Sequence, residues 1–289
     1  MARNLLGIVG GSGLYDLPGL SDTRWVTVDT PWGAPSDAIF CGRLGEAELA
    51  FLPRHGRGHR IPPGEVNYRA NIAALKMLGV SDVLSLSAVG GLHEEVPPGT
   101  FVVVDQFIDR TFAREKSFFG TGLVAHVSMA HPVCSRLGRH VLAALEALQL
   151  PHADGGTYLA MEGPQFSSRA ESELYRSWSC DVVGMTNMPE AKLAREAELC
   201  YCSVAMVTDF DCWHPGHDAV TVDAIIKVLL GNAMSAQQLV ARLGETIAAD
   251  AHANACACRQ ALQHALITAP QMRDAQMVEK LRAIAARVL

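Results

Sequence analysis

The sequence predicts an α/β fold, a single domain with a central mixed β-sheet flanked by helices. Short apolar runs alternate with helical patterns along the chain, as in other α/β domains. A run such as 101–104 is apolar throughout, which is typical of a strand covered on both faces. No linker or repeat divides the 289 residues, of which 49% are hydrophobic and 19% charged, so a disordered chain is excluded.

The expected elements follow in chain order. Strands are expected at 5–9, 49–52, 83–86, 101–104, 182–185 and 200–207. Helices are expected at 66–78, at 140–148, from 168 to about 178, at 189–198, and over most of the chain from 221 to the end. Ser168 and Glu171 have the spacing of a capping box, which fixes the start of the third helix. The domain is expected to span 1–289, with 244–289 as a helical C-terminal extension.

Composition limits the compartment and the partners. The chain carries 30 acidic and 24 basic residues, a net charge of −6, which argues against a general nucleic-acid binder. No apolar run reaches the length of a membrane span, and the first residues lack a signal-peptide pattern. We therefore expect a cytoplasmic protein with no membrane or nucleic-acid partner. Most of its eight cysteines are expected to be small buried hydrophobes.

Polar residues follow several predicted strands, where α/β folds bind ligands. They are Ser12 in the glycine turn 10–13, the pair Arg54-His55, Ser87, the pair Met185-Thr186, and Asp209 with Asp211. Glycines allow a backbone to approach an oxyanion, and the arginine fork suits phosphate oxygens. These residues indicate a site for a small molecule with an anion at one end. An ordinary glycine turn and a solvated charged loop remain the alternatives.

Two further features suit a flat polar ring. Phe166 precedes the capped helix and can stack on such a ring, or it can be buried against the helix start. Asp209 and Asp211 end an apolar strand, where carboxylates are costly unless they bind something. A salt-bridged or helix-capping pair is the alternative for these aspartates.

Cofactor and metal patterns are weak. The glycine turn lacks the third glycine of a dinucleotide fingerprint and the lysine of a P-loop. Cys200, Cys202, Cys212 and His214 can suggest zinc, but their spacing is not that of a zinc ribbon. The Cys-x-Cys pair at 256 and 258 can be a redox pair, although a reducing compartment favours free thiols. We expect no metal.

Taken in order, six stretches resemble the trimeric purine nucleoside phosphorylases, in particular the branch that cleaves 5′-methylthioadenosine. They are GGSGL (10–14), RHG (54–56), VNYRAN (66–71), DQFIDRT (105–111), EGPQFSSRAES (162–172) and TDFDCW (208–213). The resemblance covers about 5–243 and is specific because of the order of the motifs. It implies the fold of that family and the reaction of a nucleoside with phosphate, which gives a free purine and a sugar 1-phosphate.

The resemblance also implies roles for residues. Phosphate would be held by Ser12, Arg54, His55, Ser87 and Thr186, with a contribution from Ser167. The nucleoside would contact Ala88, Phe166, Ser167, Met185, Asp209 and Asp211, with Phe166 on the base and Met185 against the ribose. His126 would come from a neighbouring subunit, which implies a homotrimer. Positions 12 and 87 carry Ser where the family leads us to expect Thr, and both keep the hydroxyl. Inorganic phosphate would be a co-substrate, and no cofactor is expected.

The chemistry agrees with these roles. Glycosidic cleavage passes through an oxocarbenium-like transition state, which an anionic phosphate stabilises and then attacks. Asp209 can protonate N7 of the leaving purine if burial raises its pKa. A protonated Asp beside N7 and a carboxylate beside the 6-amino group match adenine rather than a 6-oxopurine. Val222 and Ile225 share a helix face that would either line the 5′ pocket or form core.

Other functions remain open at this stage. The nearest alternative is a phosphorylase for 5′-methylthioinosine or for purine nucleosides in general. A nucleoside-binding protein would have no need of the phosphate residues, and a hydrolytic nucleosidase would need a carboxylate base for water. An NAD enzyme is disfavoured by the incomplete glycine fingerprint.

Overall fold

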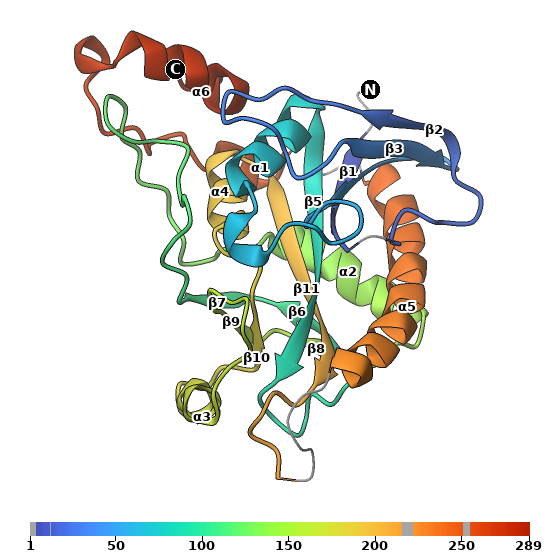
Figure 1. The fold of residues 1–289 in the computed structure, drawn as a ribbon. Helices are drawn as coiled ribbons and strands as arrows, with labels where there is room; N and C mark the ends of the chain where they lie inside the picture. The colour runs from blue at the N-terminus through green and yellow to red at the C-terminus, as the bar shows by residue number, and fades with distance from the viewer. Residues whose placement is uncertain (1–3, 12, 216–221, 251–254) are drawn as a thin grey trace.

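A mixed sheet of eleven strands runs through the middle of the protein (Figure 1). The computed structural model describes residues 4–11, 13–215, 222–250 and 255–289. The strands are β1 (Leu5–Gly10), β2 (Ser21–Val26), β3 (Ile39–Leu44), β4 (Ala47–Pro53), β5 (Val80–Gly91), β6 (Phe101–Val104), β7 (Gln106–Asp109), β8 (His152–Asp154), β9 (Thr157–Ala160), β10 (Val182–Gly184) and β11 (Cys200–Asp209). The α-helices are α1 (Tyr68–Met77), α2 (Ser135–Ala147), α3 (Arg169–Ser177), α4 (Glu190–Glu196), α5 (Val222–Ala248) and α6 (Ala275–Ala285).

The long strand β5 organises the sheet. It pairs in parallel with β1 on one side and β11 on the other, and β4 lies parallel to β1. At its end, Gly90 and Gly91 pair antiparallel with β10, which leads on to β9 and β7. The sheet therefore divides at the carboxyl end of β5, and the ends of β1, β4, β5 and β11 gather at this division.

Helices cover both faces of the sheet (Figure 1). On one face, Ile72 and Leu75 of α1, Leu193 of α4 and Leu281 of α6 belong to one buried cluster. On the other, α2 and α5 pack with β1, β4 and β11 in a second cluster. Both faces are covered, which explains why all ten residues of β11 except Asp209 are buried.

Local signals in the sequence explain two helix starts. Asn67 caps α1, since its side chain accepts a hydrogen bond from the backbone N–H of Ala70 at 3.1 Å. Ser168 caps α3 in a complete capping box with Glu171, which confirms the predicted pair. These caps fix the two helices that precede β5 and β10.

The α/β class with a central mixed sheet is confirmed, and several boundaries differ from those expected. Strand β5 runs from Val80 to Gly91, so Ser87 lies within it rather than after it. Helix α2 begins at Ser135, five residues before the expected start, with Cys134 as its N-cap. The prediction of a mostly helical chain after 221 holds only for α5 and α6. Helix α5 continues past 244 to Ala248, and the described residues between α5 and α6 contain only two short 3₁₀ turns, Ala257–Gln260 and Pro270–Met272.

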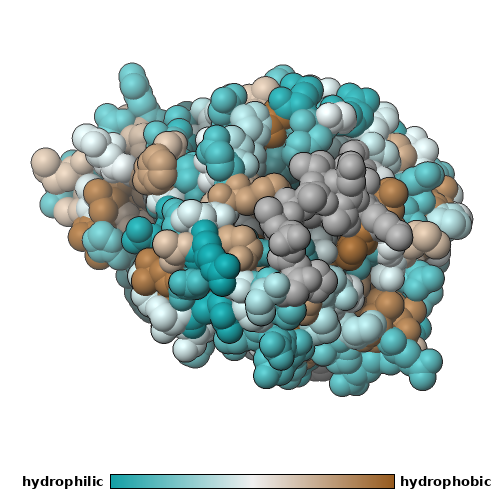
Figure 2. Space-filling model, turned by 60° about the horizontal axis from the view of Figure 1, so that its bottom comes forward, coloured by the Kyte–Doolittle hydropathy of each residue, from teal (hydrophilic) through white to brown (hydrophobic). Residues whose placement is uncertain are grey.

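The surface carries a mixture of residue types. On the face in Figure 2, hydrophobic residues lie among hydrophilic ones. Large exposed apolar side chains include Phe112, Met234 and Met272. Among the described residues, no helix is both long enough and apolar enough to cross a membrane.

Candidate active site

A cavity of about 630 Å³ opens where the sheet divides. It is lined from the ends of β4, β5, β10 and β11 and from the loop before α3. Ten of the predicted site residues meet there: Arg54, His55, Ser87, Ala88, Phe166, Ser167, Met185, Thr186, Asp209 and Asp211. The volume is in the usual range for a small-molecule site. The structure therefore brings these ten residues together around one cavity, and their roles stay a prediction.

Two hydroxyl groups lie at one end of the cavity. Ser87 Oγ is buried and has no hydrogen-bond partner among the described residues. Thr186 is also buried, and its Oγ1 lies 3.4 Å from the hydroxyl of Tyr158. A buried hydroxyl without a partner is costly, so Ser87 is ready to donate to an oxygen of a ligand.

Arg54 lies beside these hydroxyls, but most of its donors are already used. Its Nε and Nη2 bind the Glu190 carboxylate at 2.9 and 3.1 Å, and Nη2 also donates to Ser85 Oγ at 2.6 Å. Nη1 donates to the Leu86 carbonyl at 3.0 Å, which leaves one of its two hydrogens for a ligand. Burial raises the pKa of Glu190, but Arg54 outweighs this and the pKa lies below its usual value. Arg54 therefore supplies a fixed positive charge and a single free N–H.

His55 also lines the cavity, in a defined protonation state. Burial and the charge of Arg54 lower its pKa to about 4, so the ring is neutral near pH 7. Its Nδ1 lies 2.9 Å from the carbonyl oxygen of Ile61, and a carbonyl only accepts, so Nδ1 carries the hydrogen. Nε2 is then an acceptor. In this tautomer the neutral ring cannot donate to an anion through Nε2.

Asp209 and Asp211 line the cavity where β11 ends. A register shift between β11 and β5 after Val207 turns the end of the strand toward the cavity, and Asp209 pairs with Gly90. A Cβ on Gly90 would lie 3.1 Å from both Asp209 Oδ1 and Asp211 Cβ, so only glycine leaves room for the pair. Asp211 has φ 52°, in the left-handed region, so the chain turns there and is not extended.

The surroundings of Asp209 favour protonation. Burial raises the pKa of Asp209 and of Asp211 above the usual value. Asp209 Oδ1 accepts the Asp211 N–H at 2.8 Å, and Oδ2 lies 2.7 Å from Thr208 Oγ1. Thr208 Oγ1 is also 3.1 Å from the Val89 carbonyl. Because a hydroxyl has one hydrogen, both Thr208 contacts are satisfied together when Asp209 carries a proton.

The rest of the cavity wall is largely apolar. Phe166 is 52% exposed, so it is presented by its loop rather than buried against the helix start. Met185 packs against Gly163, where a Cβ would lie 2.5 Å from its Sδ. Ser167 Oγ contacts Met161 Sδ at 3.6 Å, and the Ser167 carbonyl accepts a weak bond from Cys212. Such a wall suits the faces of a ring and a sugar.

Four predicted site residues are not placed in the cavity. Ser12 lies outside the described residues, as do the side chains of Val222 and Ile225 in the first turns of α5. His126 is exposed, with its N–H bonded to the Ala265 carbonyl, and is not among the residues that line the cavity. The role of these four residues stays a prediction.

Other residues of the site were not predicted. Glu190, Ser85 and Tyr201 surround Arg54, and Tyr201 donates to Glu190 Oε1 at 2.9 Å. His59 and Arg60 line the cavity beside His55, and the basic stretch 54–60 was the signal that could have identified them. The proposed zinc set of Cys200, Cys202, Cys212 and His214 is not among the described groups of possible metal ligands.

The comparisons with known proteins agree with this geometry. A model of the phosphorylase superfamily matches residues 5–245, and the chain belongs to this superfamily. Within it, the chain is similar to proteins named S-methyl-5′-thioadenosine phosphorylase. It is 60% identical to that of Rhodospirillum rubrum, over 99% of this chain and 97% of the relative, and 58% identical to that of Cereibacter sphaeroides, over 99% of each.

Solved structures give the same result. A methylthioadenosine phosphorylase from an antarctic soil metagenomic library superposes with a TM-score of 0.92 at 46% identity, over 98% of this chain and 99% of that one. The methylthioadenosine phosphorylase of Schistosoma mansoni in complex with adenine has a TM-score of 0.84 at 37% identity, over 89% and 96% of the two chains.

Proposed function

We propose that the protein catalyses the phosphorolysis of 5′-methylthioadenosine to adenine and 5-methylthioribose 1-phosphate. One observation carries the proposal: the carboxyl groups of Asp209 and Asp211 line one cavity together with the fixed cation of Arg54 and the Ser87 hydroxyl, which has no partner among the described residues. The names of the relatives support the same reaction. Inorganic phosphate is the co-substrate, and the step uses no cofactor.

In this mechanism phosphate binds in the part of the cavity that Ser87 and Thr186 line. Ser87 and Thr186 donate to its oxygens, and Arg54 adds one N–H and its charge. The Arg54 charge is held in place by Glu190, so little reorganisation is needed when the anion binds. The phosphate then stabilises the positive charge that develops on the sugar and forms the new C1–O bond as the C1–N9 bond breaks.

The purine binds in the part of the cavity that Asp209 and Asp211 line. Asp209, in its protonated form, gives its proton to N7 as the C1–N9 bond breaks, and this neutralises the leaving base. Asp211 accepts a hydrogen bond from the 6-amino group through Oδ2, which is buried and has no partner among the described residues. A 6-oxopurine would present an acceptor to this acceptor, so adenine is the preferred base.

The middle of the cavity holds the sugar and the face of the base. Phe166 packs on the purine and Met185 lies against the ribose. By the family resemblance, Val222 and Ile225 are assigned to the 5′-methylthio group, and their side chains lie outside the described residues.

Product analysis tests the proposal. Purified protein is incubated with methylthioadenosine or methylthioinosine, each with and without phosphate, and the products are separated by chromatography. Adenine released only with phosphate is the expected result. Turnover of methylthioinosine alone would overturn the base assignment, and cleavage without phosphate would indicate a nucleosidase.

We also propose a homotrimer in which His126 enters the cavity of a neighbouring subunit. His126 lies on a strip where Val124 and Ile267 are 38% and 60% exposed, and an apolar strip of this kind suits an interface. Light scattering coupled to size exclusion gives the subunit number. If His126→Ala leaves the KM for methylthioadenosine unchanged, this role is wrong.

The proposed compartment and pathways follow from the chemistry. All eight cysteines are free thiols, which suits the reducing cytoplasm. The two products, adenine and a methylthio sugar phosphate, would return to purine and methionine salvage.

A further inference from the structure

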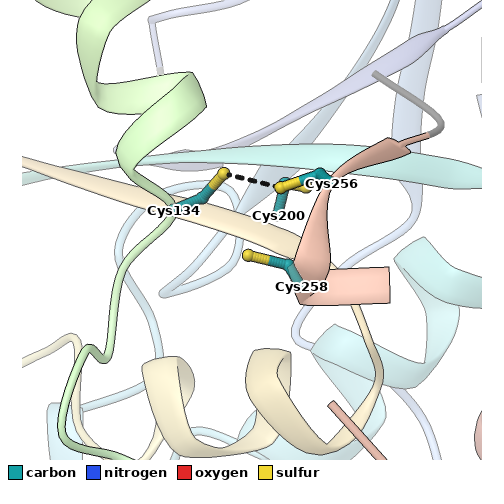
Figure 3. Close-up of side chains that lie close together, drawn as sticks. All are labelled: Cys134, Cys200, Cys256 and Cys258. Atoms are coloured by element: carbon teal, nitrogen blue, oxygen red, sulfur yellow. Dashed lines mark hydrogen bonds between the residues drawn. The ribbon is translucent and has the colours of Figure 1, made fainter. Parts of the chain in front are cut away.

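Four cysteine sulfurs from three distant segments meet on the side of the sheet covered by α2 (Figure 3). Cys134 is the N-cap of α2, Cys200 begins β11, and Cys256 and Cys258 lie at the start of the first 3₁₀ turn after α5. All four Sγ atoms lie within 4.8 Å of one another, and those of Cys134 and Cys256 are 3.5 Å apart. Among the described residues that line the active-site cavity, none belongs to this cysteine cluster.

These distances match those required by a tetrahedral metal ion. Four thiolates bound to zinc at about 2.3 Å place their sulfurs about 3.8 Å apart. The contact of 3.5 Å between Cys134 and Cys256 is close to that value and far from the bond length of about 2.0 Å in a disulfide. Cys134, Cys200 and Cys258 are buried and Cys256 is half-buried, so the site is enclosed but open to an entering ion on one side.

The surroundings of the cluster favour thiolates. The backbone N–H of Leu137, in the first turn of α2, donates to Cys134 Sγ at 3.5 Å. Arg195 Nη1 donates to Cys258 Sγ at 3.6 Å. Arg136 lies beside Cys200, although it also pairs with Asp82 and Asp250. Donors of this kind to the ligand sulfurs are what a metal–thiolate site needs, since four thiolates on Zn²⁺ leave two negative charges.

We propose that Cys134, Cys200, Cys256 and Cys258 bind one structural Zn²⁺ ion. Four soft sulfur ligands in a tetrahedral arrangement select zinc or iron, and an enclosed set of four protein ligands leaves no open position for catalysis. The ion would tie the segment after α5 to α2 and β11. This proposal departs from the expectation of no metal, which rested on the sequence spacing of Cys200, Cys202, Cys212 and His214.

Metal analysis tests the proposal directly. Untagged protein is purified without chelator or added metal, and its metal content is measured by inductively coupled plasma mass spectrometry. One zinc per chain is expected in the wild type and in Cys41→Ser, a buried cysteine of β3 outside the cluster. Cys256→Ser, at the least buried ligand, should lose at least nine tenths of the zinc. Iron in its place, or less than a tenth of an equivalent of zinc in the wild type, would overturn the proposal.

Three further measurements separate a metal site from a disulfide or an adventitious thiol cluster. Intact mass after alkylation without reductant should show eight alkylated cysteines once the metal is removed, whereas a bridge within the cluster would refute the zinc site.

Cobalt exchanged into the wild type should give the visible bands of tetrahedral cobalt–thiolate, and Cys256→Ala should not. A chelator should lower the thermal midpoint of the wild type and leave that of Cys256→Ala unchanged. Equal responses would show that no metal is bound there.

Discussion

Replacing Asp209 by Asn removes the proton proposed for the leaving base and preserves the local structure. In the wild type, Asp209 Oδ1 lies 2.8 Å from the Asp211 nitrogen and Oδ2 lies 2.7 Å from Thr208 Oγ1. In the variant, the amide oxygen can still accept the Asp211 N–H, and the amide nitrogen can donate to Thr208 Oγ1. Thr208 then donates to the Val89 carbonyl. The free energy of unfolding should change by less than about 1 kcal/mol, since both hydrogen bonds survive.

The same substitution should lower kcat/KM for methylthioadenosine by about 10²–10⁴, which is about 3–5 kcal/mol in the transition state. The assay is the initial rate with saturating phosphate as a function of pH. Because burial raises the pKa of Asp209, the wild type keeps its acid form to a higher pH than an exposed aspartate and loses activity as pH rises through that pKa. Asp209→Asn should lack this descending limb.

Asp211→Asn is the matched control for this experiment. It should keep the descending limb, because Asp209 is intact, and should shift preference from adenine toward 6-oxopurine nucleosides. If Asp209→Asn keeps kcat/KM within about tenfold of the wild type, or retains the limb, then Asp209 is not the general acid.

Three further predictions follow from buried polar groups. Ser87→Ala should raise the KM for phosphate about tenfold, the loss of one hydrogen bond, without lowering the thermal midpoint, since the hydroxyl has no partner among the described residues; an unchanged KM would remove Ser87 from the phosphate site. Glu190→Gln leaves the buried charge of Arg54 without its counter-ion and should lower the free energy of unfolding in urea by about 3–5 kcal/mol, whereas a loss below about 1 kcal/mol would contradict the pairing. Burial raises the pKa of Glu196 to about 7, so its contribution to stability is present below the ordinary pKa of glutamate and is lost as pH rises through 7. Glu196→Gln should therefore lose less stability than the wild type between about pH 4.5 and 7.5, as measured by thermal midpoints, and parallel curves would refute the shift.

The parts of the fold that were predictable are those that carry local signals. Apolar runs marked the central strands β1, β4, β6 and β11, and polar residues at their ends marked the cavity. Strand β2 gave no such signal, since five of its six residues are exposed. The second half of β5 was not predicted, because Ser87, Gly90 and Gly91 interrupt the apolar pattern although the strand is mostly buried.

Long-range pairs had no signal in the sequence. Glu190 lies 136 residues from Arg54, and nothing in its own neighbourhood indicates that it fixes the cation of the phosphate site. The cysteine cluster is a similar case, because Cys134 and Cys256 are 122 residues apart and are brought together by the packing of the segment after α5 against α2 and β11. Contacts of this kind depend on the whole fold rather than on spacing.

The hydrogen on Nδ1 of His55 has a consequence for the choice of anion. With Nδ1–H bound to Ile61 and a pKa of about 4, Nε2 can only accept a hydrogen bond near neutral pH. Monohydrogen phosphate has an O–H to donate to Nε2, and so does monohydrogen arsenate. Sulfate is fully deprotonated, so its oxygens and Nε2 are both acceptors and repel each other. The protein should therefore use arsenate and be inhibited weakly by sulfate, and sulfate inhibition with a constant near the KM for phosphate would show that His55 is protonated. A single half-buried imidazole would in this way distinguish two tetrahedral anions of nearly equal size by the proton that only one of them carries.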